Sequence, residues 1–165
     1  MPHPIVNLDE LDMRDHGQGD TFQAKLGQIG QRVGAQKMGY MLIVVPPGKR
    51  AFPFHSHNTN EEMFFILEGS GEIRIGEEHH QVRKGDVIAC PPGGPDSAHQ
   101  IVNTSTTEEL KYLGVSTMIR PEVAEYPDSG KFGVRADIPG ADGEEARVFW
   151  YIGREGAAVD YWDGE

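Results

Sequence analysis

The sequence has few of the residues on which several classes of protein depend. Of its 165 residues only Cys90 is a cysteine, so an internal disulfide is excluded. Lysine and arginine number 15 against 26 aspartates and glutamates, which gives a formal net charge of -11. Surfaces that bind a nucleic-acid backbone or an anionic membrane need clustered basic charge. We therefore expect neither nucleic acid nor a membrane as a partner.

Long apolar stretches are also missing. No run approaches the ~20 residues that a transmembrane helix needs, and the opening sequence MPHPIVNLDELD lacks the basic and apolar regions of a signal peptide. Together with the single cysteine, these features predict a cytoplasmic protein. Cys90 ends the apolar run DVIAC before Pro91, so we interpret it as a small buried thiol rather than as a soft metal ligand or a nucleophile.

Glycine and proline, by contrast, are frequent and divide the chain into short segments. There are 21 glycines and 11 prolines, and the segments between them have the length and spacing typical of an all-β barrel or sandwich. No long amphipathic helical pattern is present, although a short helical turn is expected near residues 121–125. The expected strands are residues 21–29, 38–45, 52–57, 61–68, 71–76, 79–83, 86–90, 98–104, 110–118 and 146–153.

The chain is long enough for one domain with a core of its own. We expect an N-terminal extension at residues 1–20, a barrel at 21–118 and a C-terminal extension at 119–165. Within that extension a polar, glycine- and proline-rich linker is predicted at residues 126–145. Five aromatic residues follow it, and they are expected to cover either the barrel's own outer face or a second subunit: Phe149, Trp150, Tyr151, Tyr161 and Trp162. The unpaired strand edges expected of such a sheet favour a two-fold homodimer.

The most informative residues are three histidines and a glutamate. His55 and His57 lie two positions apart, so on an extended strand their side chains point the same way. Glu62 opens the next apolar run, and His99 opens another. Three imidazoles and a carboxylate have the composition of a first-row transition-metal site. Ligands from separate strands can converge if those strands line one concave face, as they do in a small barrel.

The segments that contain these residues resemble the two sequence motifs of the cupin superfamily. The first reads Gly48-KRAFPF-His55-Ser-His57-NTNE-Glu62-MFFILE-Gly69, with six residues rather than five after Gly48. The second reads Gly85-DVIAC-PP-Gly93-GPDSA-His99-QIV-Asn103, with five residues rather than two before the histidine. Both departures fall in loops, where insertions are tolerated best. The chain is similar to a group of largely uncharacterised bacterial single-domain cupins, some of which carry a provisional sugar-phosphate isomerase assignment.

The resemblance implies a cupin-type double-stranded β-helix, or jelly-roll barrel, with N- and C-terminal extensions. It also implies that His55, His57, Glu62 and His99 bind one divalent transition metal, whose identity (Zn, Fe, Mn, Ni or Cu) the ligands do not select. Glu61 is the alternative carboxylate, but only Glu62 is followed by six residues and a glycine, as in the motif.

Strand alternation then predicts a small-molecule pocket with a mostly apolar lining. Tyr40 and Tyr112 are the candidates for acid–base or anchoring roles, with core packing as the alternative for both. Lys49, Arg50 and the Arg83-Lys84 pair are the few basic groups near the motifs that could meet a phosphate. The other residues expected to line the pocket are Leu42, Val44, Phe64, Ile66, Ile101 and Asn103.

Three functions from different classes fit this site. The first is a metal-dependent enzyme that uses Lewis-acid chemistry on an oxygenated substrate, such as a sugar or a sugar phosphate. The second is an O₂-using dioxygenase, and the third is a non-catalytic protein that binds a metal or a small ligand. The sequence alone does not decide whether the protein is an enzyme, because function resides in the site and not in the fold.

Overall fold

The computed structural model describes residues 3–140 and 145–165, and about half of these residues lie in antiparallel strands. One short α-helix, α1 (Gly30–Val33), and four 3-10 turns join them. The strands are β1 (Arg14–Gln18), β2 (Phe22–Gln28), β3 (Met38–Val45), β4 (Ser56–His57), β5 (Glu62–Glu68), β6 (Ser70–Ile75), β7 (Glu78–Arg83), β8 (Val87–Cys90), β9 (His99–Val102), β10 (Leu110–Thr117), β11 (Glu122–Tyr126), β12 (Lys131–Ile138) and β13 (Arg147–Gly153).

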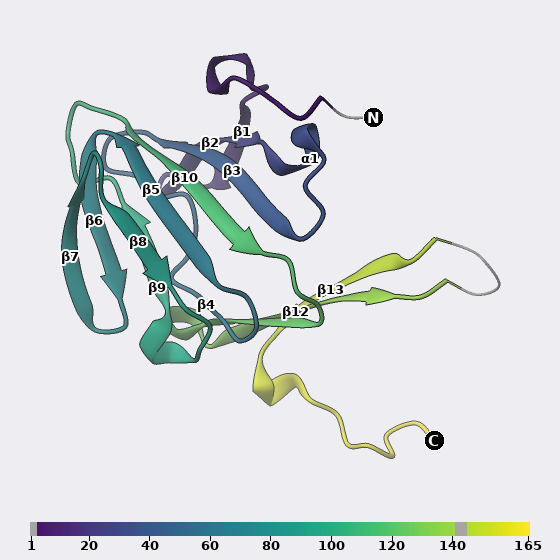
Figure 1. The fold of residues 1–165 in the computed structure, drawn as a ribbon. Helices are drawn as coiled ribbons and strands as arrows, with labels where there is room; N and C mark the ends of the chain where they lie inside the picture. Colours follow the sequence, from purple (N-terminus) through teal and green to yellow (C-terminus); the bar gives the residue numbers. More distant parts are fainter. Residues whose placement is uncertain (1–2, 141–144) are drawn as a thin grey trace.

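Two sheets form the barrel that the sequence predicts (Figure 1). One has the strand order β1-β2-β3-β10-β5-β8, and the other has the order β7-β6-β9. Side chains alternate between the two faces of each strand. In β5, Phe64 and Ile66 are buried while Met63 and Phe65 are exposed, as the predicted inward direction of Glu62 requires. The all-β jelly-roll barrel is therefore confirmed.

The interior of the barrel is filled mainly by aliphatic and aromatic side chains. Burial of each such side chain removes apolar surface from water and stabilises the fold by about 1.5–3 kcal/mol. The buried residues of this cluster are Ala24, Ile43, Val45, Ala51, Phe64, Ile66, Ile73, Val82, Cys90, Ile101, Leu110 and Tyr112. This core fills the space between the two sheets.

A second, smaller cluster lies outside the barrel. Leu42 and Val44 of β3 point outward and are buried with Leu11 and Ile29. The N-terminal segment supplies further apolar side chains to this cluster, from Val6, Leu8 and Met13. That segment therefore covers part of the outer face. The prediction that Leu42 and Val44 line the pocket beside the predicted metal ligands is wrong, because these positions have the opposite parity to Ile43 and Val45.

The third sheet, ordered β13-β12-β11-β4, contains strands that the sequence did not predict. Residues 122–126 form β11 instead of a helical turn, because Ala124 and Glu125 pair with His57 and Ser56 of β4. Residues 131–138 form β12 inside the expected linker, where the alternating Phe-Gly-Val-Arg-Ala pattern pairs with β13. Strand β1 was also missed, because its sequence RDHGQ is polar and exposed and has no apolar alternation.

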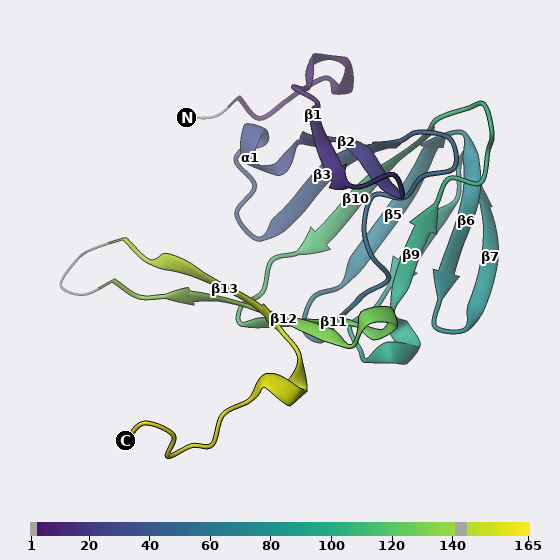
Figure 2. The ribbon, with the colours of Figure 1, turned by 180° about the vertical axis from the view of Figure 1, so that it is seen from behind.

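The β12–β13 hairpin extends away from the barrel, and the C-terminal tail lies below it in both views (Figures 1 and 2). Trp150 and Tyr151 are 54% and 44% exposed, and Tyr161 and Trp162 are 83% and 71% exposed. Within one chain these aromatic side chains therefore do not cover the barrel's outer face. No helix in the described part of the chain has the length and apolar character needed to cross a membrane.

Candidate metal centre

Three β elements bring the predicted ligands together at one end of the barrel. Glu62 is the first residue of β5, His99 is the first of β9, and His57 is the last of the two-residue strand β4. His55 precedes β4 and forms an isolated antiparallel bridge with His99. In this bridge the amide of His99 donates to the carbonyl of His55 over 2.8 Å, and the reverse hydrogen bond is 3.2 Å. The backbone therefore fixes the two imidazoles side by side.

The same nitrogen of each imidazole faces the same carboxylate oxygen. The Nε2 atoms of His99, His57 and His55 lie 2.9, 3.5 and 3.8 Å from Oε2 of Glu62. Ligand atoms of His55, Glu62 and His99 all lie within 4.8 Å of one another, and His57 falls just outside that group. The structure therefore brings all four predicted residues together and places the carboxylate of Glu62, rather than that of the exposed Glu61, at their centre.

An oxygen atom lies near the opposite ring nitrogen, Nδ1, of each of the three histidines. Nδ1 of His55 lies 2.9 Å from the carbonyl oxygen of Pro53, and Nδ1 of His99 lies 3.3 Å from that of Ser97. Nδ1 of His57 lies 3.5 Å from Oε1 of Glu122, too poorly aligned for a hydrogen bond. An acceptor at Nδ1 favours the tautomer with its proton there, which leaves the Nε2 lone pair free for a metal.

Burial and mutual charge set the protonation of the cluster. Burial, together with the charge of His99, lowers the pKa of His55 to about 4, partly offset by Glu62. Burial would also lower the pKa of His57, but its contacts with Glu62 and Glu122 raise it overall. For Glu62 burial acts to raise the pKa, and the hydrogen bonds and charges of the surrounding histidines outweigh it and lower it. An ionised carboxylate amid imidazoles is the donor set that a divalent transition metal takes.

The donor set therefore fits a divalent metal. The three Nε2 atoms and Oε2 already face one another, and two of the Nδ1 atoms have carbonyl acceptors. His55, His57, Glu62 and His99 would hold the ion. The metal itself and its identity stay predictions.

A cavity of about 640 Å³ opens over the ligands and is more polar than predicted. Tyr40 lines it together with His55, His57 and Glu62, but Tyr112 does not. Tyr112 is 2% exposed, and burial followed by the charge of Glu62 raises its pKa. Four other residues predicted for the lining are instead packed in the protein interior, because the cavity lies beyond the middle of the strands: Phe64, Ile66, Ile101 and Asn103.

Asn103 has a structural role rather than a lining role. Its side-chain amide donates to the carbonyl oxygens of Val45 and Glu108 over 2.9 and 2.8 Å, and its Oδ1 accepts from the amide of Ser105 over 3.0 Å. The side chain is 0% exposed. It therefore ties the loop after β9 to the end of β3.

Glu122 is the functional candidate that the sequence reasoning missed. It is the first residue of β11 and is 6% exposed in the cavity wall. The backbone amide of Asn58 donates to its Oε1 over 3.1 Å, and the side-chain amide of Asn60 donates to its Oε2. A predicted strand at residues 122–126 would have placed Glu122 and Ala124 on the same face. Because we expected a helical turn there, this alternation was missed.

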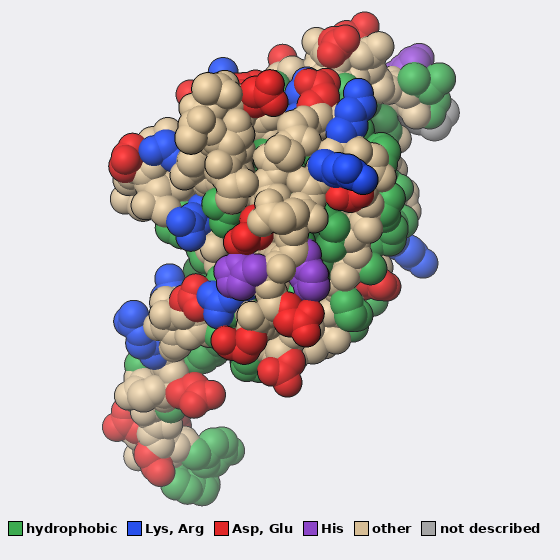
Figure 3. All heavy atoms as spheres, turned by 90° about the vertical axis from the view of Figure 1, so that its left-hand side faces the viewer, with side chains coloured by type: hydrophobic (Ala, Val, Ile, Leu, Met, Phe, Trp, Pro, Cys, Tyr) green, Lys and Arg blue, Asp and Glu red, His purple; other side chains and the backbone are tan. Residues whose placement is uncertain are grey.

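The remaining histidines and the cysteine lie apart from this cluster. His79 and His80 have side chains that are 54% and 51% exposed and contact Glu72 and Glu78. Histidine side chains are visible at the surface of the face that carries β7, beside acidic ones (Figure 3). Cys90 is a buried free thiol, as predicted, and burial followed by the charge of Glu62 raises its pKa to about 12.

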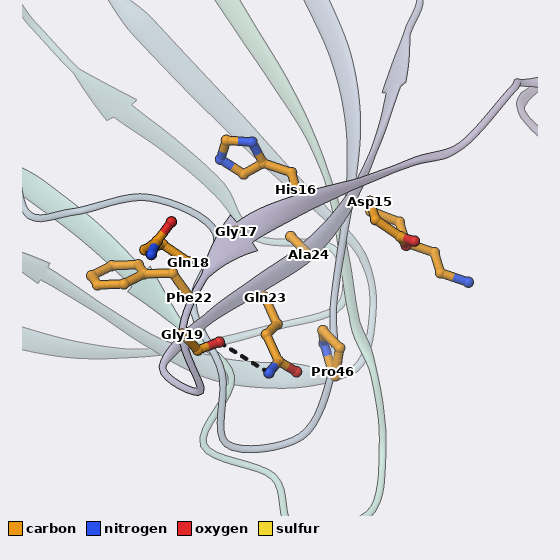
Figure 4. A pocket seen from close by; sticks show the side chains of 10 residues that line it. Asp15, His16, Gly17, Gln18, Gly19, Phe22, Gln23, Ala24 and Pro46 are labelled. Carbon is orange, nitrogen blue, oxygen red and sulfur yellow. Dashed lines mark hydrogen bonds between the residues drawn. The ribbon is translucent and has the colours of Figure 1, made fainter.

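A second hollow of about 480 Å³ lies against the β1–β2 hairpin (Figure 4). Asp15, His16, Gln18 and Gln23 are among its lining residues, and the Gln23 amide donates to the carbonyl of Gly19 over 3.3 Å. Within residues 3–140 and 145–165 the only group of three or more potential metal ligands is the one around Glu62. The candidate site is therefore the cavity above that cluster and not this hollow.

The chain is similar to a known protein family over a little less than half of its length. The Cupin_2 family model, described as a cupin domain, matches residues 41–116, which span β3 to β10. An uncharacterised protein of Methanocaldococcus jannaschii is 40% identical over 60 residues, which cover 36% of this chain and 47% of that protein. The aligned segment thus spans about half the length of that relative.

Two solved structures match almost the whole chain. A proposed sugar phosphate isomerase from Acidithiobacillus ferrooxidans superposes with a TM-score of 0.75 at 23% identity, covering 94% of this chain and 95% of that one. A cupin-superfamily sugar phosphate isomerase from Silicibacter pomeroyi gives a TM-score of 0.76 at 23% identity, covering 97% and 98%. At this identity the likeness establishes the fold. The whole chain therefore shares the fold of these two structures, and its residues 41–116 are similar to a cupin domain.

Proposed function

We propose that the chain is a metal-dependent enzyme that acts on a small oxygenated substrate through Lewis-acid chemistry. The observation that carries the proposal is the convergence of three Nε2 atoms on Oε2 of Glu62 at the base of a 640 Å³ cavity. A divalent ion held there would polarise a substrate carbonyl or hydroxyl. The names of the two whole-chain structural relatives favour a sugar phosphate as the substrate class.

The protein side chains would position the substrate and exclude competing water. Tyr40 lines the cavity and would anchor the substrate or transfer a proton if its hydroxyl reaches it. Further hydrogen-bonding groups come from Gln28 and Gln31 on one side and from Ser116 and Thr117 on another. A lining with this many polar groups suits a hydroxylated substrate better than the apolar substrate considered for a dioxygenase.

The metal is tested first by elemental analysis of protein purified without added metal. We expect about one divalent ion per chain, lost in the double variant His57→Ala/His99→Ala, while circular dichroism retains the β spectrum. The double variant His79→Ala/His80→Ala is a matched control, because these exposed residues lie on β7 away from the cluster. Full metal occupancy in the His57/His99 variant would overturn the ligand assignment.

The chemistry is tested on the Co(II)-substituted protein. Small bidentate oxyanions such as oxalate, or a hydroxy acid, are expected to change its visible spectrum, because four protein ligands leave room in an octahedral shell. An unchanged spectrum at millimolar ligand, with the metal bound, would favour the binding-protein alternative. Oxygen consumption in a substrate screen would instead favour the dioxygenase.

A further inference from the structure

Three arginines from separate parts of the chain line the cavity above the metal ligands. Arg14 comes from β1, Arg120 from the segment between β10 and β11, and Arg135 from β12. Among the residues that the structure describes, no lysine lines this cavity. The chain has 26 acidic residues and 15 basic ones, so a cavity lined by three guanidinium groups differs from the negative net charge of the chain as a whole.

The carboxylates in the cavity wall do not neutralise these arginines. The lining contains two, Glu62 and Glu122, and both are engaged elsewhere. Glu62 contacts the histidines, and Glu122 accepts from the Asn58 amide and from the side chain of Asn60. Since a bound divalent ion would offset the charge of both carboxylates, the guanidiniums of Arg14 and Arg135 are left as the unbalanced charge of the cavity.

Two of the arginines also lack a protein partner. Arg120 pairs with Asp137 of β12, which ties the loop before β11 to the hairpin. Arg14 and Arg135 form no ion pair and no side-chain hydrogen bond with any residue that the structure describes. Both are exposed within the cavity wall, so their donors face water and are available to a ligand.

An aromatic surface lies next to one of them. Trp150 is directly opposite Arg135 in the register of β12 and β13, and it lines the same cavity. Its indole is 54% exposed. An exposed indole beside a guanidinium offers an apolar face for a carbon skeleton and a donor for an anion attached to it.

We propose that Arg14, Arg120 and Arg135 form the phosphate subsite of this cavity, so that the substrate is a phosphate monoester of a hydroxy-carbonyl compound. The proposal rests on the proposed function for the metal half of the site and adds the residues that select the phosphate. Guanidinium groups bind phosphate oxygens through paired, charge-assisted hydrogen bonds, and a dianionic phosphate can engage more than one of them. Lys49 and Arg50 are not part of the subsite, since neither of them lines this cavity.

The test is calorimetric titration of the full chain with D-glucose 6-phosphate and with D-glucose. We expect the phosphate ester to bind at least about tenfold more tightly than the unphosphorylated sugar, and binding to weaken as salt is added. Arg14→Gln and Arg135→Gln should each weaken binding of the ester about tenfold or more, because each removes charge-assisted hydrogen bonds. Both residues are exposed, so the variants are expected to fold.

Arg147→Gln is the matched control, because Arg147 is an exposed arginine at the start of β13 that does not line the cavity. Unchanged binding in this control with losses at Arg14 and Arg135 supports the subsite. Equal affinity for glucose and its phosphate, no binding of the ester to the intact chain at millimolar concentration, or equal losses in all three variants would overturn it.

Metal-free protein separates this proposal from the proposed function. The arginines do not depend on the ion, so inorganic phosphate should bind to metal-free protein. The substitution Arg135→Gln should weaken that binding. If that holds but no metal binds, the proposed function fails and the subsite stands. If metal binds to the intact chain and neither Arg14→Gln nor Arg135→Gln changes the affinity for phosphate, the subsite fails and the metal site stands.

Discussion

Oε1 of Glu122 lies 3.5 Å from Nδ1 of His57, on the far side of the imidazole from Glu62. This contact joins β11 of the C-terminal extension to β4 of the barrel, and the same two strands pair through Ala124 and His57. The carboxylate is itself held by Asn58 and Asn60. A carboxylate outside the family motifs therefore lies next to the ring nitrogen of His57 that faces away from Glu62.

Replacing Glu122 with glutamine is expected to lower metal affinity about 10- to 100-fold, the usual loss when a carboxylate behind a histidine ligand is removed. The change keeps the size of the side chain, so the fold should persist. Competition with a chromophoric chelator measures the affinity. Glu125→Gln is the control, because Glu125 lies on the same strand with the opposite parity. Equal affinity in the Glu122 variant and the intact chain would contradict an orienting role.

The two histidines of the first motif are expected to titrate in opposite directions in the metal-free protein. Burial, followed by the charge of His99, lowers the pKa of His55 to about 4, whereas the contacts of His57 with Glu62 and Glu122 outweigh burial and raise its pKa. At pH 5 we expect His57 to be protonated and His55 neutral. Carbon-13 NMR of the imidazoles measures both. Parallel titration near pH 6.5 would contradict the geometry.

The sign of the stability effect follows from each shift. At pH values between about 4, the pKa of His55 in the folded chain, and its unfolded value near 6.5, His55 is protonated in the unfolded chain and neutral in the folded chain. This residue therefore lowers stability as the pH falls through that window. His57 acts oppositely: its raised pKa contributes stability at low pH that is lost as the pH rises through the folded value.

The barrel and the convergence of the four candidate ligands could be predicted from the sequence because they depend on local pattern. Alternation in β5 placed Glu62, Phe64 and Ile66 on one face, and the observed burial agrees. The predicted strand at 38–45 coincides with β3. Proline explains a shortfall: the strand expected from residue 52 begins only at Ser56, because Pro53 cannot donate to a ladder.

The cavity wall could not be read in this way because it depends on long-range pairing. Arg14 and Arg135 lie 121 positions apart, in a polar hairpin strand and in an expected linker, and only the folded chain brings both to one cavity. Glu122 reaches His57 through the pairing of β11 with β4. Inward parity predicted that Phe64 and Tyr112 line the pocket, but both lie in the core, because parity does not show where along a strand the core ends and the cavity begins.

The homodimer stays a prediction, and the C-terminal hairpin is the segment on which to test it. Val148 and Ile152 lie on one face of β13 and are 52% and 45% exposed. A chain with this surface is expected to self-associate by burying it. Sedimentation velocity at micromolar concentration should give a dimer, and Val148→Ser/Ile152→Ser should shift it toward monomer. A monodisperse monomer of the intact chain would count against the dimer.

Asn103 allows a test of the barrel's stability that is independent of the metal. Its buried amide makes two donated hydrogen bonds and one accepted one, which join β3 to the loop after β9. Asn103→Ala leaves the carbonyl of Val45 and its neighbours without these partners. Each unsatisfied buried group costs about 1–3 kcal/mol, so we expect the free energy of unfolding to fall by about 2–4 kcal/mol.

Urea denaturation of metal-free protein measures this loss without a contribution from metal binding. Asn7→Ala is the control, because Asn7 is exposed and its side chain accepts only one local hydrogen bond, from Asp9, at the first 3-10 turn. That variant should lose less than about 1 kcal/mol. Similar unfolding midpoints for the two variants would mean that the loop after β9 is held by other contacts, and that Asn103 does not anchor the end of the strand that begins with His99.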